Sequence, residues 1–328
     1  MPLKILIVKP SSLGDIVHSL PAVAAIRDAN PDAEITWVIN PEWAPLLRGN
    51  RDIDHVHIFP RGEFRGFGAP GRLFPWMRET RRLQPDVALD FQGLFRSALI
   101  AKISGAKRIF GASDAREGSR LFYTEVARVD RHEHAVDRYL KIAEAFGAPL
   151  RENLRFPIPT GDQLPRFDAF PGFVVLHPFA RGRNKSIGPS VILEFCRALG
   201  PARVVVVGKS KRRFSTPENC VDMTNQTSLL QLIWLLRAAA FVISVDSGPM
   251  HLAAAVTTNL VSIHTRTDPR RVGPYNEAAT IWKNGKLIRV AGLGSATDLR
   301  KKGRKFLPDD VGPVADLAMR ALAKQPLI

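Results

Sequence analysis

The sequence predicts an α/β protein of two units, each a parallel β-sheet covered by helices. Short apolar runs alternate with helical patterns in both halves of the chain, as expected for repeated β–α–β units. The length of 328 residues suits about two domains. Prolines punctuate 147–172, where the alternation stops. We therefore expect a linker there, with one unit at 1–160 and the other at 161–328.

In the first unit, short apolar runs predict five strands, and the longer segments between and after them predict five helices. The expected strands are Lys4–Val8, Ile35–Ile39, His55–Phe59, Asp86–Asp90 and Arg108–Phe110. The expected helices are Ile16–Ala29, Pro41–Leu47, Gly71–Leu83, Leu94–Ser104 and His134–Phe146.

The same alternation predicts five strands and four helices in the second unit. The expected strands are Phe173–His177, Arg203–Val207, Cys220–Asp222, Phe241–Val245 and Leu260–Ile263. The expected helices are Pro189–Leu199, Ser228–Ala239, Pro249–Ala255 and Asp310–Ala323.

The most apolar run, Leu229–Val245, contains Gln231 and Arg237 and is shorter than the about 20 apolar residues of a membrane-spanning helix. We interpret it as a buried helix followed by a buried strand. The apolar run Leu3–Val8 is also too short for the apolar core of a secretory signal.

The composition favours an acidic partner. Lys and Arg total 47 against 31 Asp and Glu, a net charge of +16, and residues 161–328 carry +12 of it (24 basic, 12 acidic). Such a charge suits phosphate, anionic lipid or nucleic acid. Two cysteines, Cys196 and Cys220, exclude a disulfide framework and a Cys-rich zinc site, and they fit a reducing compartment.

The first segment with chemical potential is Lys9–Asp15 (KPSSLGD), between a strand and a helix. Gly14 permits close approach of a ligand, and Ser11, Ser12 and backbone N–H groups can meet polar atoms. Asp15 stands at the start of the helix, where it either caps the helix or acts on a substrate; its spacing leaves both open. The segment has neither the Walker spacing nor the dinucleotide-binding glycine pattern.

The second segment is Ser244–His251 (SVDSGPMH), which follows a strongly apolar strand. Gly248 opens a helix whose first N–H groups and dipole form an anion site suited to a diphosphate. Asp246 and Ser247 flank this site, and His251 lies about one turn further on. The alternative is that Asp246 or Ser247 merely caps the helix and that His251 is a core residue.

The third segment is His177–Lys185 (HPFARGRNK), again after a strand. Arg181, Arg183 and Lys185 are placed to neutralise a leaving diphosphate, unless the segment is simply an exposed basic loop.

Two further groups are weak candidates for metal ligands. Asp52-Ile-Asp54 has an Asp-x-Asp spacing, and Asp130–His134 carries two histidines and two acidic residues. Carboxylates at the start of a strand or helix are more often structural, so we expect no metal site.

Several segments, in this order, resemble the lipopolysaccharide heptosyltransferases of glycosyltransferase family nine, and most closely its type I members, which add the first heptose. The resemblance covers nearly the whole chain, and the Ser-Ser-Leu-Gly-Asp and Asp-Ser-Gly-x-x-His elements together make it specific. The similar segments are ILIVKPSSLGDIVHSLPAVAAI (Ile5–Ile26), DFQGLFRSA (Asp90–Ala98), RE (Arg116–Glu117) with LFY (Leu121–Tyr123), EHAVDRY (Glu133–Tyr139), FVISVDSGPMHLAAA (Phe241–Ala255) and TDPRRVGPY (Thr267–Tyr275).

The resemblance implies a GT-B fold, with two Rossmann-like lobes facing a central cleft, and an inverting transfer that needs neither metal nor cofactor. It implies ADP-L-glycero-β-D-manno-heptose as donor and Kdo (3-deoxy-D-manno-octulosonic acid) of lipid A as acceptor, in synthesis of the lipopolysaccharide inner core. The lobe at 1–160 would bind the acceptor and that at 161–328 the nucleotide sugar. The resemblance therefore implies a cytoplasmic protein that is peripheral to the inner membrane and has no nucleic-acid partner.

The resemblance also implies roles for single residues. Asp15 occupies the position of the catalytic base. The implied donor-binding residues are Lys185, Asp246, Ser247, Gly248 and His251. Because arginine pairs well with planar oxyanions, we expect an acceptor-binding set rich in arginine. This set is Ser11, Ser12, Gly14, Arg61, Arg96, Arg116, Arg120 and Arg138.

The apolar residues Phe64, Phe67, Phe74 and Trp76 either touch the membrane or belong to the core. The chain also departs from the family pattern, because Phe179 and Ala180 stand where members often have small hydroxyl residues. An acidic residue near the nucleoside is hard to place: Lys209–Arg213 is basic, and Glu218 is a doubtful substitute. These departures leave the base and the donor sugar open.

Three alternatives remain. One is a related family-nine transferase with a different donor or acceptor. Another is a non-enzymatic nucleic-acid-binding protein, suggested by the sequence pI of about 10.4 but disfavoured by few tyrosines and scattered basic residues. A Rossmann dehydrogenase is disfavoured by the missing glycine pattern.

Overall fold

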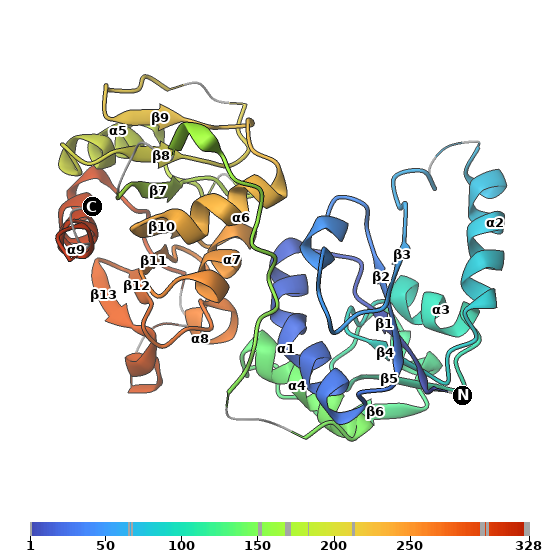
Figure 1. Cartoon of the computed structure of the whole chain (residues 1–328). Coiled ribbons are helices and arrows are strands. Elements are labelled where there is room, and N and C mark those ends of the chain that lie inside the picture. The colour runs from blue at the N-terminus through green and yellow to red at the C-terminus, as the bar shows by residue number, and fades with distance from the viewer. Residues whose placement is uncertain are drawn as a thin grey trace. The chain divides into compact units, whose positions relative to one another are not determined.

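A computed structural model describes residues 2–64, 66, 68–149, 153–167, 172–182, 184–211, 214–295, 299 and 302–324. The chain divides into two compact units, Met1–Pro159 and Thr160–Ile328 (Figure 1). Each unit has its own sheet and its own core.

The sheet of the first unit has six parallel strands in the order β3-β2-β1-β4-β5-β6. The central strand β1 pairs on both sides, so that Ile5 lies between Ile35 and Val87. The strands are β1 (Lys4–Val8), β2 (Glu34–Ile39), β3 (His55–Ile58), β4 (Val87–Asp90), β5 (Arg108–Ala112) and β6 (Glu125–Ala127). The helices are α1 (Leu13–Ala29), α2 (Ala69–Arg82), α3 (Phe95–Ile103) and α4 (Ala135–Phe146), with 3₁₀ turns η1 (Ala44–Leu47) and η2 (Ser119–Phe122).

Helix α1 is buried along almost its whole length because it packs against both its own sheet and α4. Its sequence is accordingly apolar on all sides rather than along one stripe, as expected for an interior helix. Its amino end is therefore fixed by packing, and this end carries Asp15.

The sheet of the second unit repeats this order and adds one antiparallel strand, giving β13-β12-β11-β10-β7-β8-β9. The strands are β7 (Val174–His177), β8 (Val204–Val206), β9 (Cys220–Asp222), β10 (Phe241–Val245), β11 (Leu260–Ile263), β12 (Thr280–Lys283) and β13 (Lys286–Arg289). The helices are α5 (Pro189–Ala198), α6 (Leu229–Ala238), α7 (Gly248–Val256), α8 (Pro269–Val272) and α9 (Val311–Leu322), with 3₁₀ turns η3 (Pro165–Phe167), η4 (Val290–Ser295) and η5 (Pro308–Asp310).

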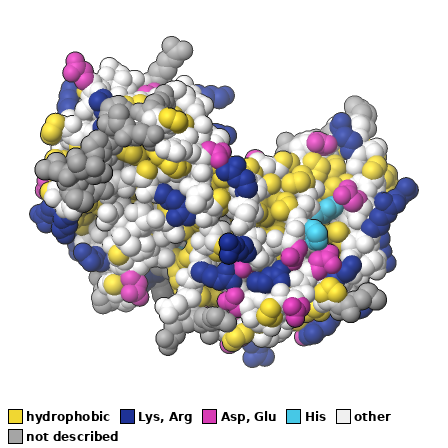
Figure 2. Space-filling model, viewed as in Figure 1, with side chains coloured by type: hydrophobic (Ala, Val, Ile, Leu, Met, Phe, Trp, Pro, Cys, Tyr) yellow, Lys and Arg dark blue, Asp and Glu magenta, His cyan; other side chains and the backbone are white. Residues whose placement is uncertain are grey.

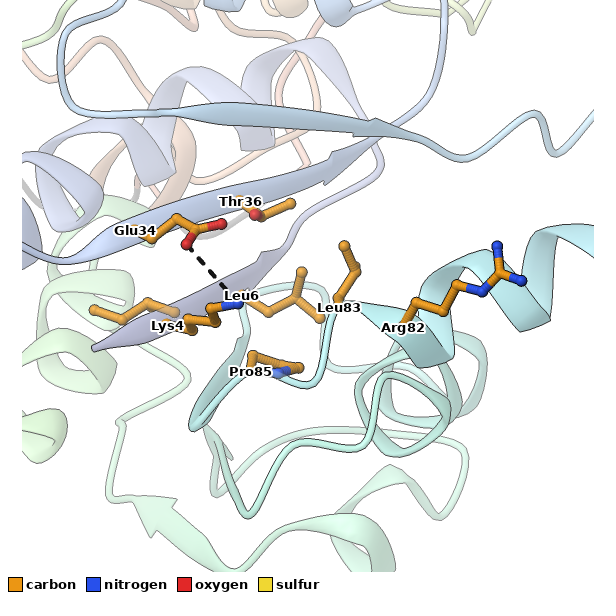
Figure 3. A pocket seen from close by; sticks show the side chains of 8 residues that line it. Lys4, Leu6, Glu34, Thr36, Arg82, Leu83 and Pro85 are labelled. Carbon is orange, nitrogen blue, oxygen red and sulfur yellow. Dashed lines mark ion pairs between the residues drawn. The ribbon is translucent and has the colours of Figure 1, made fainter. Parts of the chain in front are cut away.

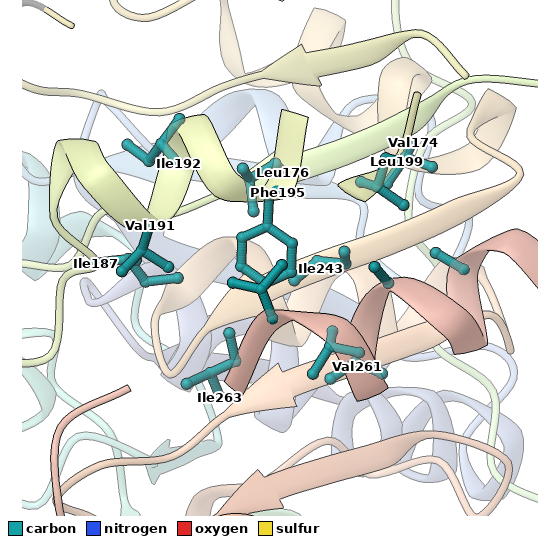
Figure 4. Packing of buried hydrophobic residues seen from close by; sticks show 14 of the residues in the cluster. Val174, Leu176, Ile187, Val191, Ile192, Phe195, Leu199, Ile243, Val261 and Ile263 are labelled. Atoms are coloured by element: carbon teal, nitrogen blue, oxygen red, sulfur yellow. The ribbon is translucent and has the colours of Figure 1, made fainter. Parts of the chain in front are cut away.

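The main core of the second unit lies between one face of this sheet and the helices α5 and α9 (Figure 4). Phe195 of α5 is fully buried and stacks on Phe306, and Phe306 meets Trp282 of β12 edge to face. Aromatic pairs of this kind add to the free energy gained from burial alone. The carboxyl ends of β7 and β10 are thus held on a rigid support.

Most expected elements are present, but one expected helix is wrong and two further features were not expected. Pro41–Leu47 is not an α-helix: Pro45 has no N–H to donate, and only the 3₁₀ turn η1 forms. The strand β6 is too short to stand out in the sequence. The hairpin β12–β13 turns at Asn284-Gly285, both with positive φ (54° and 81°), and this dipeptide is a strong hairpin signal that apolar periodicity overlooks.

The apolar run Leu229–Val245 divides into α6 and β10, as expected from its polar interruptions. Within the described part of the chain, none of the helices combines the length and the apolar character needed to traverse a bilayer.

The neighbouring loops that follow β4 and β5 are joined through a buried carboxylate. The hydroxyl groups of Tyr123 and Ser97 both donate to Oδ2 of Asp90, over 2.7 and 2.9 Å. Gly111 makes room for the Tyr123 ring, since a Cβ atom at this position would lie 2.1 Å from a ring carbon. Only glycine at 111 allows Tyr123 to reach Asp90.

We therefore predict that Gly111→Ala displaces Tyr123 and lowers the free energy of unfolding by about 1–3 kcal/mol, the usual effect of overpacking. The measurement is the midpoint of thermal unfolding. Gly62→Ala is the matched control, because a Cβ atom at Gly62 meets nothing within 4 Å. Equal midpoints for the two variants would contradict the prediction.

Candidate active site

The strand order reverses once in each sheet, and most of the predicted site residues follow the strands at these two points. In the first unit the reversal lies between β1 and β4, and in the second between β7 and β10. Loops leaving the carboxyl ends of such strand pairs run in opposite directions and leave space for a ligand. Asp15 follows β1, Lys185 follows β7 and Asp246 follows β10.

The loop after β1 holds Asp15 at the first turn of α1. Ser12 is the N-cap residue, and its N–H and hydroxyl both donate to Oδ2 of Asp15, over 3.2 and 2.6 Å. Asp15 therefore does contribute to the helix start, as the capping interpretation expected. Its side chain is only half-buried, like those of Ser11 and Ser12, whereas Gly14 is buried in the first turn.

A buried lysine, to which the sequence analysis gave no role, lies beneath this loop. Lys9 is 2% exposed and donates to the carbonyl of Phe91 over 2.9 Å and to the hydroxyl of Tyr139 over 2.8 Å. Burial lowers the pKa of Lys9, but attraction to Tyr139 and to Asp15 and the bond to Tyr139 outweigh burial and raise the pKa. A permanent positive charge therefore acts on Asp15 from below. The signal in the sequence is a lysine at the end of an otherwise apolar strand.

Three of the predicted arginines are brought together by the loops after β4 and β5. Arg96 begins α3, and Arg116 and Arg120 belong to the loop and turn that follow β5; all three are exposed. The N–H of Arg116 donates to the carbonyl of Gly93 over 2.9 Å, so the two loops are in direct contact.

The other two predicted arginines lie elsewhere in the first unit. Arg138 of α4 is half-buried and forms an ion pair with Asp114. Arg61 is exposed and follows the edge strand β3, which β2 and β1 separate from β4. The structure therefore groups Arg96, Arg116 and Arg120, and does not group Arg61 with them.

In the second unit, Lys185 and Asp246 form an ion pair. The Nζ atom of Lys185 is 2.6 Å from Oδ2 of Asp246, and the hydroxyl of Thr267 donates to the same oxygen over 2.5 Å. Burial raises the pKa of Asp246, but the electrostatic interactions with His264 and Lys185 and the bonds from Lys185 and Thr267 outweigh burial and lower the pKa. Burial lowers the pKa of His264 itself to about 4, so at neutral pH the charged partner of Asp246 is Lys185. Asp246 is thus a buried anion at neutral pH, and it holds the ammonium group of Lys185.

The start of α7 lies directly after this aspartate. Ser247 is the N-cap residue and Gly248 the first residue of the helix, as expected. The hydroxyl of Ser247 is 3.2 Å from Nδ1 of His177, which is fully buried. Burial lowers the pKa of His177 to about 4, so the ring is neutral and orients the hydroxyl without adding charge. His251 is buried on the same helix.

The loop that carries Lys185 is closed by its own hydrogen bonds. The N–H of Ala180 donates to the hydroxyl of Ser186 over 2.9 Å, and the N–H of Lys185 donates to the carbonyl of Gly182 over 3.0 Å. Arg181 is exposed, and Arg183 lies outside the described residues.

Phe179 does not contribute to the site, because it is buried in the core. Phe179 is therefore an apolar packing position in this chain.

Thr267 and its neighbours are functional-site residues that the sequence analysis missed. Because the hydroxyl proton of Thr267 goes to Asp246, its oxygen accepts from Nδ1–H of His264, 3.1 Å away. The opposite nitrogen of His264 then accepts from Ser262, also over 3.1 Å. Lys283 is 1% exposed and donates to the carbonyl of Thr267 over 2.8 Å. The sequence analysis noted the segment Thr267–Tyr275 only for its similarity to the family, and it assigned no role to the hydroxyl group of Thr267.

The weak metal-ligand candidates have structural tasks. Asp52 accepts two bonds from Arg155, over 2.8 and 2.7 Å, and Asp54 pairs with Arg27. His134 caps α4 by accepting from a backbone N–H. Across the residues that the structure describes, no group of three or more His, Cys, Asp or Glu side chains is arranged to hold a metal.

A cavity of about 150 Å³ in the first unit opens at the amino ends of β1 and β2, where Lys4 and Glu34 form an ion pair (Figure 3). These residues begin their strands. The cavity is therefore at the sheet edge opposite to the one that carries Asp15, and it contains none of the predicted site residues.

Two Rossmann-like sheets of the same strand order within one chain, each with polar groups at its point of reversal, are the architecture of the GT-B fold. The model of glycosyltransferase family 9 (heptosyltransferase) matches residues 76–291. The chain belongs to this family and is a glycosyltransferase.

Named relatives agree with this assignment. The chain is 27% identical over 295 residues to lipopolysaccharide core heptosyltransferase OpsX of Haemophilus influenzae, covering 84% of this chain and 82% of the relative. It is 27% identical over 304 residues to lipopolysaccharide heptosyltransferase 1 of Salmonella typhimurium, covering 84% and 92%.

Solved structures agree with the fold. The structure of E. coli heptosyltransferase WaaC with ADP has a TM-score of 0.71 at 22% identity and covers 85% of this chain and 92% of its own. A family 9 glycosyl transferase from Veillonella parvula has a TM-score of 0.78 at 19% identity and covers 98% of each chain.

The lowered pKa of Asp246 predicts how stability changes with pH. A carboxyl group whose folded pKa lies below its ordinary value of about 3.9 stabilises the fold above that value, and this contribution is lost as the pH falls through the folded pKa. We expect Asp246→Asn to lower the thermal unfolding midpoint at neutral pH, and the difference from wild type to shrink below about pH 4.

The matched control is Asp32→Asn on the exposed surface, which should change stability by less than about 0.5 kcal/mol. A difference between wild type and Asp246→Asn that widened as the solution became more acidic would contradict the assignment.

Proposed function

We propose that the chain transfers heptose from ADP-L-glycero-β-D-manno-heptose to the Kdo of lipid A, with inversion at the anomeric carbon and without a metal, in synthesis of the lipopolysaccharide inner core. The names of the relatives, lipopolysaccharide heptosyltransferase 1 among them, support the substrate class. The observation that carries the proposal is the Lys185–Asp246 pair beside the start of α7.

This pair supports binding of a diphosphate by the second unit. An ammonium group has three N–H donors, and one of them engages Asp246, which fixes the direction of Lys185. The first N–H groups of α7 and the hydroxyl of Ser247 add neutral donors at the positive end of a helix dipole. Charge developing on the leaving ADP is stabilised by such preorganised donors, and we assign Gly248 and His251 to the same donor site.

Asp15 is the proposed base. The proton of the acceptor hydroxyl moves to Asp15, the acceptor oxygen forms a bond to the anomeric carbon, and the bond from that carbon to the diphosphate breaks. ADP leaves with the electron pair of that bond. The charge of Lys9 below the loop supports an ionised Asp15 before transfer.

The exposed arginines support an anionic acceptor on the first unit. Arg96, Arg116 and Arg120 stand together, and guanidinium groups pair with carboxylate and phosphate oxygens, both of which Kdo-lipid A provides. We assign Ser11, Ser12 and Gly14 to the acceptor side, and Arg61 and Arg138 to its margin. A lipid-borne acceptor places the enzyme at the cytoplasmic face of the inner membrane.

The decisive experiment is incubation with ADP-heptose and Kdo-lipid A, with ADP release and product mass as readouts. A product heavier by one heptose supports the proposal. If another nucleotide sugar is turned over in preference to ADP-heptose, that sugar is the donor. A panel of donors is informative because Phe179, one of the departures from the family pattern, is buried in the core. If no donor in the panel supports transfer to Kdo-lipid A, the proposal that Kdo-lipid A is the acceptor is wrong.

Asp15→Asn keeps the shape of the side chain but removes the base. General base catalysis contributes about 10²–10⁴-fold, so we expect turnover to fall by this factor while ADP affinity stays unchanged. Steady-state turnover and calorimetric ADP binding measure the two quantities. Asp32→Asn is the control; turnover of Asp15→Asn within about threefold of that control would remove Asp15 from the mechanism.

Lys185→Gln tests the donor side. Loss of a charge-assisted contact to phosphate should weaken ADP binding about tenfold or more and lower kcat/KM by at least the same factor. Lys286→Gln, a change of the same chemistry at an exposed position of the same unit, is the matched control. Equal ADP affinity of the two variants would contradict a phosphate contact by Lys185.

A further inference from the structure

The aromatic side chains near α2 offer no reactive group. Hydrophobic side chains reach the surface of the first unit (Figure 2), and one of them is Phe74 of α2, which is 66% exposed. Trp76 is buried and Phe64 packs against it, which places both in the core, and Phe67 lies outside the described residues. Reactive side chains of another kind, two free thiols, lie in the second unit.

The two cysteines of the sequence, Cys196 and Cys220, lie close together in that unit. Cys196 is near the carboxyl end of α5, and Cys220 is the first residue of β9. The side chain of Asn219, the residue before Cys220, donates to the carbonyl of Cys196 over 2.7 Å and to the carbonyl of Ala202 over 3.1 Å. Cys196 is 1% exposed, and the half-buried Cys220 packs against the same core cluster. The fold therefore brings together two thiols that the sequence analysis did not pair.

The two thiols are also hydrogen-bonded to each other. The bond from Cys220 lowers the pKa of Cys196 against the opposing effect of burial. The same bond, together with burial, raises the pKa of Cys220, because the proton is held between the two sulfur atoms. The pair therefore favours one thiolate, and the thiolate is the form of cysteine that reacts with disulfides.

We propose that Cys196 and Cys220 form a dithiol site, which a small disulfide of the class of oxidised glutathione converts reversibly into an intrachain disulfide bond. Sulfur atoms in hydrogen-bond contact need only a small approach to become bonded. The half-buried Cys220 is the member that the oxidant reaches, and the buried Cys196 completes the bond. A reversible bond agrees with a reducing compartment, because it forms only when small disulfides accumulate.

The exchange conserves atoms and electrons. Sγ of Cys220 attacks one sulfur of the small disulfide, whose S–S bond breaks, and the released thiolate takes the proton of Cys220. Sγ of Cys196 then attacks Sγ of Cys220 and displaces the second small thiolate, which takes the proton of Cys196. The two cysteines lose two electrons, and the small disulfide gains them as it becomes two thiols.

The dithiol site lies at the sheet edge opposite to the candidate active site of the second unit. The strands β9, β8, β7 and β10 are parallel, and Cys220 begins its strand, whereas Lys185 and Asp246 follow the carboxyl ends of β7 and β10. The disulfide ties α5 to the start of β9. We therefore expect oxidation to stabilise the second unit without changing the loops that carry Lys185 and Asp246.

The experiment incubates the full chain, without denaturant, with oxidised glutathione, then blocks the remaining thiols with N-ethylmaleimide and digests the product with trypsin. Cleavage after lysine and arginine places Cys196 in peptide 186–197 and Cys220 in peptide 214–237. We expect mass spectrometry to find these two peptides as one disulfide-linked species, which dithiothreitol separates.

The two single substitutions are the matched controls. Cys196→Ser should stop at the mixed disulfide of Cys220 with glutathione, and Cys220→Ser should react more slowly, since only the buried thiol remains. The proposal is overturned if wild type also stops at a mixed disulfide, if both of its thiols stay unmodified, or if its cysteines link two chains instead of one.

Stability gives a second readout. Oxidation should raise the thermal unfolding midpoint of wild type by about 5–10 °C, because the bond restricts the unfolded chain. Cys220→Ser treated in the same way should show no such rise. Equal midpoints for reduced and oxidised wild type, with the linked peptides present, would overturn the stabilising effect of the bond.

ADP binding tests the separation from the active site. Reduced and oxidised wild type should bind ADP with equal affinity by calorimetry, and a weaker affinity after oxidation would overturn this separation. The dithiol site does not rest on the proposed reaction. Linked peptides in a protein that transfers no heptose would leave the dithiol site in place and reject the reaction, and transfer by a protein without linked peptides would do the reverse.

Discussion

The buried carboxylate of Asp246 is the interaction on which the second unit's site depends. It receives Lys185 from the loop after β7 and Thr267 from the loop after β11, so one side chain joins three loops at the same sheet edge. Burial of an anion is unfavourable unless charge and hydrogen bonds compensate it, and here they do so well enough to lower its pKa. The stabilising partner, Lys185, is also the cation proposed to meet phosphate. Stability of the loops and placement of the functional charge are therefore one arrangement.

Asp90 in the first unit shows what happens to a similar carboxylate whose hydrogen bonds come from neutral groups. Its partners are hydroxyl groups of Ser97 and Tyr123 and backbone N–H groups, and burial prevails, so that its pKa is raised. This aspartate is suited to fixing loops rather than to exchanging charge with a ligand. The positive charge at this point of the first unit belongs instead to Lys9, which lies under Asp15. Each unit thus separates a structural polar group from the group that is proposed to face the substrate.

The sequence predicted the parts of this arrangement that are local. Both strand–loop–helix segments, with Asp15 and Asp246 at their turns, follow from apolar runs that end in Gly, Ser and Asp. It did not predict the supports, because their partners are distant along the chain. Lys9 is 130 residues from Tyr139, and Lys185 is 61 residues from Asp246. Pairing over such separations is set by the order of strands in the sheet, and periodicity does not contain that order.

Strand order also explains why the two units carry different chemistry on the same framework. At each reversal, the first and fourth strands of the unit lie side by side, and the residues that follow them are brought together whatever their identity. In the second unit these residues are Lys185, Asp246 and Ser247, which place an ion pair and a hydroxyl group beside the start of a helix. In the first unit they are Asp15 and the segment from Asp90 to Arg96, which present a carboxylate and an arginine. A base takes up a proton, whereas a cationic group stabilises the negative charge of a leaving group. Close together in one small pocket, each of these two groups would weaken the action of the other. In the proposed reaction the base and the phosphate-binding lysine belong to separate sheets, so each is positioned by the strand reversal of its own unit.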